Sequence, residues 1–172
     1  MERLPAFELK RPTSLAQAIE WLAATPEARA IAGGTDLVPN LRDGIGSPPV
    51  LVDLSRVPGF DAFEIRTAGV RIGAGVTLAR LASDSGLAAA LPAVSAAAAS
   101  IAGPGHRSVA TVGGNLCVDT RCVYYNQSEW WRKANGYCLK HRGDTCHVAP
   151  TGTRCHAAYQ GDLAPALIAC GA

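Results

Sequence analysis

The sequence predicts an α+β fold of mixed α/β type, with a small parallel α/β lobe followed by a larger lobe of antiparallel strands and helices. The first 56 residues alternate strand, helix and strand, as a small parallel unit does. The next segment begins with two short strands around a tight turn and continues into alanine-rich helices. Hydrophobic residues make up 48% of the 172 residues and charged residues 17%, a balance typical of globular proteins. We therefore expect lobes at residues 1–56 and 57–172.

The first lobe is expected to contain three short strands. An extended run at residues 7–10 precedes a helix over residues 15–24, whose apolar side chains recur at helical spacing. Ser14 can cap the start of this helix. The remaining elements are a strand at 28–32, a helical turn at 37–41 and a buried strand at 50–53.

The second lobe is expected to open with a hairpin around Ala68-Gly69. An alanine-rich helix should end at Gly103-Pro104-Gly105, because glycine and proline there stop helical structure. The predicted elements are strands at 64–67 and 70–72, helices at 78–81 and 91–101, and a strand at 109–112.

Residues 118–160 differ in texture from the rest of the chain. This stretch holds four of the six cysteines and three of the four histidines, and it shows little periodicity. The apolar, alanine-rich pattern then resumes at residues 162–169. We interpret residues 118–160 as an insertion into the second lobe, since long irregular loops are usually functional when they are ordered.

Charge and hydropathy exclude several classes of partner. A net charge of +2 is too small to favour nucleic acid. No run of about 18 apolar residues is present, so no membrane span is expected. Residues 1–5 lack the apolar core of a signal peptide, and we expect a cytoplasmic protein.

Two Gly-Gly pairs, at Gly33 and Gly113, carry the first functional signal. Each follows an expected strand, and glycine lets backbone N–H groups approach and surround an anion such as a phosphate. Neither pair fits G-x-G-x-x-G or the P-loop. An ordinary tight turn would also contain Gly-Gly. The candidate ligand-binding residues are Ala32, Gly33, Gly34, Thr35, Asp36 and Leu37 in the first loop and Thr111, Gly113, Gly114 and Asn115 in the second.

The motifs at residues 32–37, 111–116 and 164–167 resemble the FAD-binding subunit of the molybdenum hydroxylase (xanthine oxidase) family. The resemblance implies a PCMH-type fold in which both glycine loops contact the FAD diphosphate. It also implies that Asp162 matches an acidic residue near the adenosine ribose, although Asp162 would equally suit a cap for the next helix. Members of the family continue into a further C-terminal domain, so we expect a truncated chain or a split subunit.

The four cysteines of the insertion carry the second signal. In a reducing compartment, clustered thiols favour metal binding or redox chemistry over disulfides. They are separated by 15, 7 and 8 residues, which is not C-x-x-C spacing. Chemistry alone leaves three readings open: a [4Fe–4S] cluster, zinc bound with help from His141, His147 or His156, and unliganded thiols. We expect Cys117 and Cys170 to be buried structural thiols. The candidate metal ligands are Cys122, Cys138, Cys146 and Cys155.

The insertion resembles that of the 4-hydroxybenzoyl-CoA reductase branch of the family, whose beta subunit carries a [4Fe–4S] cluster there. This implies an electron-transfer subunit, in which a ferredoxin-like donor reduces the cluster and FAD passes electrons to a [2Fe–2S] subunit and a molybdenum-cofactor subunit. The complex would remove the hydroxyl group of 4-hydroxybenzoyl-CoA to give benzoyl-CoA. Two alternatives remain: a flavin subunit of a xanthine, CO or aldehyde dehydrogenase, and a zinc-stapled, non-catalytic interaction domain. No residue is predicted to be a catalytic base or nucleophile, since the cofactors carry the chemistry.

Overall fold

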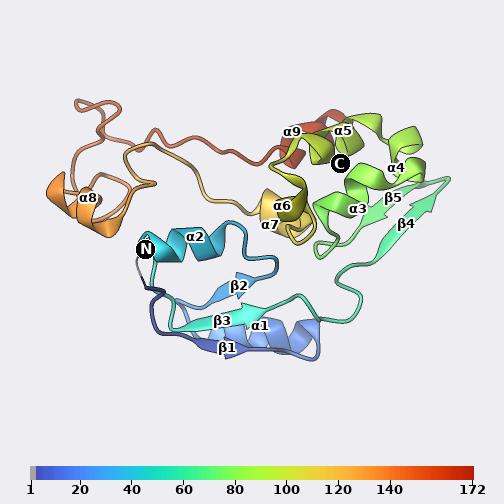
Figure 1. Ribbon diagram of the computed structural model, residues 1–172, viewed down its shortest axis with the longest axis horizontal. Helices are drawn as coiled ribbons and strands as arrows, with labels where there is room; N and C mark the ends of the chain where they lie inside the picture. The colour runs from blue at the N-terminus through green and yellow to red at the C-terminus, as the bar shows by residue number, and fades with distance from the viewer. Residues whose placement is uncertain (1–2) are drawn as a thin grey trace.

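A computed structural model describes residues 3–172 and shows two lobes with the insertion projecting from them (Figure 1). In the first lobe, three parallel strands form one sheet in the order β1-β3-β2. Its core consists of Ala18, Ala28, Val50 and Val52, which are 0–7% exposed. The elements of this lobe are β1 (Glu8–Lys10), α1 (Leu15–Ala24), β2 (Arg29–Ile31), α2 (Leu37–Arg42) and β3 (Val50–Asp53).

The predicted parallel α/β unit is confirmed, including the helix over residues 15–24. Ser14 caps α1, because its hydroxyl oxygen accepts a hydrogen bond from the Gln17 N–H at 3.2 Å. Helix α2 lies on the side of the sheet that faces the insertion (Figure 1). The loop between β2 and α2 is the first glycine loop, so the sheet and α2 together position it.

The second lobe packs helices around its own apolar core. The antiparallel hairpin predicted at its start is confirmed. Leu78, Leu81, Leu87, Val94 and Leu163 form much of the core and are 0–1% exposed. The elements are β4 (Phe63–Arg66), β5 (Gly69–Ile72), α3 (Leu78–Ser83), α4 (Ser85–Ala90), α5 (Pro92–Ser100), α6 (Pro104–Arg107), α7 (Val112–Leu116) and α9 (Leu163–Ala169).

One expectation for this lobe is wrong. Residues 109–112 do not form a strand, because Thr111 caps the short helix α7 with its side chain and accepts from the Gly114 N–H at 3.2 Å. The second Gly-Gly pair therefore lies inside a helix rather than in a turn after a strand. The expected end of the alanine-rich helix is confirmed, since α5 ends at Ser100, and Pro104 then occupies the first turn of α6, where proline is tolerated.

The insertion is mostly irregular but contains the helix α8 (Glu129–Ala134), which its weak periodicity concealed. It extends past α2 and away from the second-lobe helices (Figure 1). Arg121 and Ala158 form its neck, where each backbone N–H donates to the other's carbonyl, at 2.7 and 2.9 Å. Within residues 3–172, every helix is too short or too polar to cross a membrane.

Candidate functional site

Both glycine loops line one pocket. This pocket encloses about 450 Å³, which is within the range of small-molecule sites. Gly113 and Asp162 are not among its lining residues, and Asp162 is exposed at the start of α9. The predicted residues that the structure brings together here are Ala32, Gly33, Gly34, Thr35, Asp36, Leu37, Thr111, Gly114 and Asn115.

The first loop is pressed against the backbone of the second lobe. A Cβ added to Gly33 would lie 2.0 Å from the carbonyl oxygen of Val109, so no larger residue fits there without a shift of the backbone. Gly34 has φ of +69°, a conformation that glycine adopts without strain. The first pair of glycines therefore joins the two lobes and turns the chain into α2.

The two glycines of the second loop have different roles. Gly113 packs against Ala74: its N–H donates to the Ala74 carbonyl at 2.8 Å, and an added Cβ would lie 2.9 Å from the Ala74 Cβ. Gly114 lines the pocket, and an added Cβ would lie 3.2 Å from the Thr111 hydroxyl oxygen. Gly114 is thus where the backbone can approach a ligand closely.

The side-chain oxygens of Thr111 and Asn115 accept hydrogen bonds from the protein backbone, while the polar hydrogens of both side chains remain available to a ligand. The Thr111 hydroxyl accepts from the Gly114 N–H. The Asn115 side-chain oxygen accepts from the Leu163 N–H at 3.0 Å, which ties α7 to α9. The hydroxyl hydrogen and the Asn115 amide hydrogens can still donate to an anion in the pocket.

Asp36, the only acidic residue of the first loop, does not cap α2. Its carboxylate instead forms an ion pair with Arg121, at the neck of the insertion. Asn40 completes the group, donating to Asp36 at 3.1 Å and accepting from Arg121 at 2.9 Å. Sequence reasoning missed Arg121, because its contact with Asn40 spans 81 residues and leaves no local pattern, whereas Asn40 lies only four residues from Asp36.

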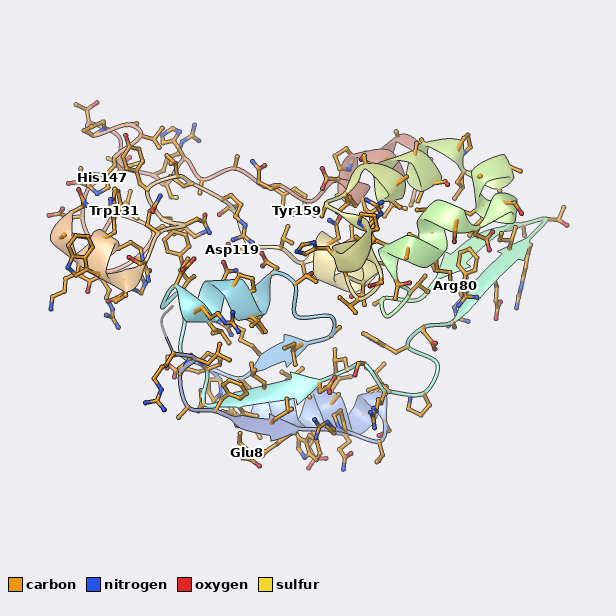
Figure 2. All side chains as sticks on the ribbon, viewed as in Figure 1. Glu8, Arg80, Asp119, Trp131, His147 and Tyr159 are labelled. Atoms are coloured by element: carbon orange, nitrogen blue, oxygen red, sulfur yellow. The ribbon has the colours of Figure 1, made fainter. Side chains whose placement is uncertain are left out.

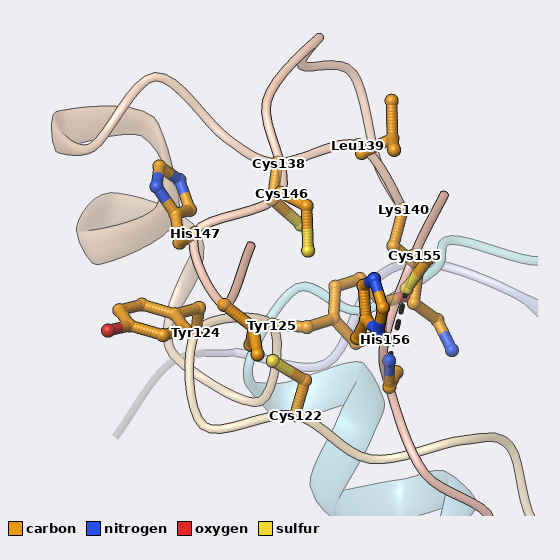
Figure 3. A pocket seen from close by; sticks show the side chains of 12 residues that line it. Cys122, Tyr124, Tyr125, Cys138, Leu139, Lys140, Cys146, His147, Cys155 and His156 are labelled. Atoms are coloured by element: carbon orange, nitrogen blue, oxygen red, sulfur yellow. Dashed lines mark hydrogen bonds between the residues drawn. The ribbon is translucent and has the colours of Figure 1, made fainter. Parts of the chain in front are cut away.

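The four predicted cysteine ligands line a second, smaller hollow inside the insertion (Figure 3). Cys122, Cys138 and Cys146 approach it from three separate segments, and Cys155 lies beside His156 (Figure 3). Cys146 is only 6% exposed. Backbone N–H groups of Ala149, Val148 and His156 lower the pKa of the Cys146 thiol from its ordinary value, although burial opposes them. The thiolate form, which binds metals, is thereby favoured.

Among residues 3–172, no three His, Cys, Asp or Glu side chains are arranged as ligands of one metal ion. A [4Fe–4S] cluster makes a different demand, because each cysteine binds its own iron and the four sulfurs surround the cluster. Four free thiols around one hollow match that ligand set in kind and number. His147 and His156 also line the hollow, whereas His141 does not.

The prediction that Cys117 and Cys170 are buried is wrong, since both are exposed. Cys117 follows α7 and lines the glycine-loop pocket. Cys170 ends α9, which buries Leu163 at its start but leaves its last turn in solvent. Apolar neighbours in the sequence were a poor guide to burial, because only one side of a short helix reaches the core.

Arg132 attaches the insertion to the first lobe. This side chain is 2% exposed and donates to the carbonyls of Asp43 and Gly44 at 3.0 and 2.8 Å, just beyond the end of α2. It also pairs with Glu129 at 2.9 Å. Gly44 permits this contact, since a Cβ there would lie 2.9 Å from the Glu129 Cβ.

Tyr125 is the residue shared by both hollows. The ammonium of Lys140 lies 4.9 Å from the centre of the Tyr125 ring. The same ammonium forms an ion pair with Asp119 at 2.9 Å. Asp119 lies between the second lobe and the insertion (Figure 2). Burial would raise the pKa of Asp119, but hydrogen bonds from Lys140 and Thr120 and the lysine charge outweigh it and lower that pKa. Tyr124 makes aromatic contacts with Trp131 and His147, which lie at the far end of the insertion (Figure 2).

Comparison with known proteins identifies the class. Residues 5–172 match the family described as the FAD binding domain in molybdopterin dehydrogenase. The match covers nearly all of the chain, and the chain belongs to this family. The sequence-based resemblance to the FAD-binding subunits of molybdenum hydroxylases is confirmed at this level.

Particular relatives are oxidoreductase subunits. The chain is 41% identical over 108 residues to the xanthine dehydrogenase FAD-binding subunit of Escherichia coli O157:H7, covering 62% of this chain and 37% of that protein. It is 35% identical to the carbon monoxide dehydrogenase medium chain of Afipia carboxidovorans, covering 64% of this chain and 38% of the relative. This chain thus spans less than half the length of these two relatives.

A third relative aligns across the insertion. The aldehyde oxidoreductase FAD-binding subunit PaoB of Escherichia coli K12 is 32% identical over 170 residues, covering 95% of this chain and 53% of that subunit. Among solved structures, quinoline 2-oxidoreductase from Pseudomonas putida 86 superposes with a TM-score of 0.64 at 35% identity, covering 66% of this chain and 40% of that one. The predicted mixed α/β, PCMH-type fold is confirmed by this similarity.

Proposed function

We propose that this chain is the FAD-binding part of a molybdenum-dependent oxidoreductase of the xanthine, CO or aldehyde dehydrogenase type. The observation that carries the proposal is that both glycine loops line one pocket in a chain of this family. The relatives named above support this type over 4-hydroxybenzoyl-CoA reductase, which was the first expectation from the sequence.

In this proposal the pocket holds the FAD diphosphate. Backbone N–H groups of the first loop would face its oxygens, and the Thr111 hydroxyl and the Asn115 amide would donate to them from α7. Gly114 would allow the backbone to approach the ligand, because it lines the pocket and carries no side chain. Asp162 remains a proposed contact of the adenosine ribose. FAD, when bound, supplies two-electron and one-electron transfer, and the protein positions it.

We further propose that Cys122, Cys138, Cys146 and Cys155 hold a [4Fe–4S] cluster. Their shared hollow and the lowered pKa of Cys146 support this ligand set. The alternative is zinc bound by some of these thiols with His147 or His156, which line the same hollow. The cluster, when bound, supplies one-electron transfer. The residues that line the hollow would surround the cluster, and Tyr125 would lie between the cluster and the flavin pocket.

The insertion favours a second candidate, the 4-hydroxybenzoyl-CoA reductase type, because a [4Fe–4S] site suits a one-electron donor such as ferredoxin. However, the alignment with an aldehyde oxidoreductase subunit runs across the same segment, so the insertion does not by itself select the reductase. Both candidates place the substrate on a molybdenum-cofactor subunit and route electrons through a [2Fe–2S] subunit. Identification of the co-purifying subunits and of the substrate they turn over separates the two.

We also propose the domain division expected from the sequence, with lobes at 1–56 and 57–172 and the insertion at 118–160. The two separate apolar clusters support it. The buried residues of one cluster fall between residues 18 and 52. Those of the other fall between residues 76 and 163, and none of them belongs to the insertion.

The flavin assignment is tested by titration of flavin-free protein with FAD. We expect saturable binding, and we expect Gly114→Asp to abolish it, because the variant places a side chain and a negative charge against the diphosphate. Gly105→Asp is the matched control: it adds the same charge to the same lobe, where, apart from the backbone of α6 and its chain neighbours, none of the described residues 3–172 lies within 4 Å of the added Cβ. Unchanged affinity in Gly114→Asp would show that the loop assignment is wrong.

The cluster assignment is tested by iron and sulfide analysis after anaerobic purification. We expect about four iron and four sulfide per chain. Cys138→Ala should lower both, whereas Cys170→Ala should not, since Cys170 lies exposed at the end of α9. Zinc without sulfide would contradict the assignment, and so would full iron content in Cys138→Ala.

A further inference from the structure

We propose that Arg121 is a positioning residue for the flavin pocket: it neutralises Asp36, so the insertion supplies the charge that lets the first glycine loop accept a diphosphate. This inference rests on the proposed FAD site. It gives the insertion a role in flavin binding that is separate from any metal it holds.

The contact geometry supports a fixed ion pair. Asp36 lines the pocket and directs its carboxylate to the Arg121 guanidinium. Asn40 forms hydrogen bonds with both side chains, donating to Asp36 at 3.1 Å and accepting from Arg121 at 2.9 Å, so the three side chains form one network. The side chains of Arg121 and Asp36 are 27% and 37% exposed, so solvent screens the pair only in part.

The electrostatic consequence follows from the position of Asp36. A carboxylate beside a diphosphate is a like charge, and it would oppose binding at the loop whose N–H groups attract the ligand. With Arg121 in place the pair is neutral overall, and the N–H groups act without this repulsion. Arg121 itself does not line the pocket, so it acts through Asp36.

The backbone of Arg121 connects this pair to the rest of the insertion. Its N–H and carbonyl pair with Ala158, at the opposite end of the insertion, at 2.7 and 2.9 Å. A change that opens the neck would therefore move the guanidinium away from Asp36. FAD affinity and closure of the insertion are then coupled, and the coupling is reciprocal.

The test measures FAD affinity by fluorescence titration of the purified protein and four variants. Arg121→Gln should weaken binding at least about tenfold, because the negative charge of Asp36 is no longer neutralised. Arg121→Lys, which keeps the charge, should stay within about threefold of the wild type. Asp36→Asn should bind FAD as tightly as the wild type or more tightly. The double variant Asp36→Asn/Arg121→Gln should recover the affinity of Asp36→Asn.

Arg154→Gln is the control, since it removes an exposed positive charge of the same insertion. Wild-type affinity in Arg121→Gln would overturn the inference while leaving the FAD site intact. Failure of the double variant to recover would also overturn it, because Arg121 would then act only through the fold. If Arg121→Gln does not fold, Asp36→Asn alone decides, and a loss of more than about tenfold would contradict the inference. Failure of the wild type to bind FAD would instead overturn the proposed function itself.

Discussion

Gly33 meets the backbone of Val109 so closely that a Cβ on Gly33 would lie 2.0 Å from the Val109 carbonyl oxygen. The contact joins the first glycine loop to the segment just before α7, which carries the second. The relative position of the two loops therefore depends on the absence of a side chain at residue 33. Any displacement at this contact would change the distance between the two loops and so weaken the binding of a diphosphate held by both.

Gly33→Ala should disturb both stability and flavin binding. Relief of the overlap requires a backbone shift, so we expect a loss of about 1–3 kcal/mol in the free energy of unfolding, as for other overpacked sites. FAD affinity should fall at least about tenfold. Urea unfolding and FAD titration measure the two effects. Gly105→Ala is the control: outside the backbone of α6 and its chain neighbours, no described residue comes within 4 Å of its added Cβ, so it should change neither quantity substantially.

Gly113→Ala should lower the free energy of unfolding more than Gly114→Ala does. Both residues lie in α7, where alanine is favoured over glycine by about 0.5–1 kcal/mol. At Gly113 the new methyl group would meet Ala74 at 2.9 Å, so this variant should be destabilised overall. At Gly114 the methyl group would lie beside the pocket and 3.2 Å from the Thr111 hydroxyl oxygen, so this variant should lose less stability than Gly113→Ala but bind FAD more weakly. Equal behaviour of the two variants would contradict the division of roles.

Arg132→Met should loosen the insertion from the first lobe. The variant loses hydrogen bonds to the Asp43 and Gly44 carbonyls, although it also removes two buried guanidinium nitrogens, Nε and Nη1, that have no partner among the described residues. We expect a net loss of about 1–3 kcal/mol in stability. Hydrogen exchange should speed up across residues 118–160. The exposed neighbour Lys133, replaced by Met, is the control; equal exchange in both variants would show that Arg132 is not the anchor.

Asp53 should make the first lobe sensitive to acid. Burial would raise its pKa, but hydrogen bonds from Ser55 and the charge of Arg11 outweigh burial and lower the pKa below its ordinary value of 3.8. A lowered folded-state pKa contributes stability that is present above the ordinary value and is lost as pH falls through the folded value. Asp53→Asn should thus be less stable than the wild type by about 0.5 kcal/mol near pH 7. The gap should close below about pH 4, and a gap that persists there would contradict the assignment.

Local signals predicted the fold well. The strands at 8–10 and 50–53, the helix at 15–24 and the hairpin after residue 62 follow from apolar periodicity, the Ser14 cap and Ala68-Gly69. Helix α7 was missed because a five-residue helix containing two glycines has poor propensity and is fixed by the Thr111 cap and by Ala74. Helix α8 was missed because its tertiary anchor, Arg132, contacts residues 88 and 89 positions away.

The site was predictable in its residue types but not in its contacts. The glycine loops and the four cysteines stand out by composition, and each set lines one hollow. The contacts of Asp36 with Arg121 and of Gly33 with Val109 depend on how the lobes meet, which no local pattern encodes. The same reason explains why Cys117, expected in the core, lies at the pocket.

The central claim is that the two glycine loops hold a diphosphate, and the most direct measurement compares FAD with riboflavin in equilibrium titrations of the flavin-free protein. Riboflavin carries the same ring system without phosphate or adenosine. We predict that FAD binds at least about a hundredfold more tightly, that ADP competes with it, and that the difference shrinks as salt rises. Equal affinity for FAD and riboflavin, or no competition by ADP, would contradict the account.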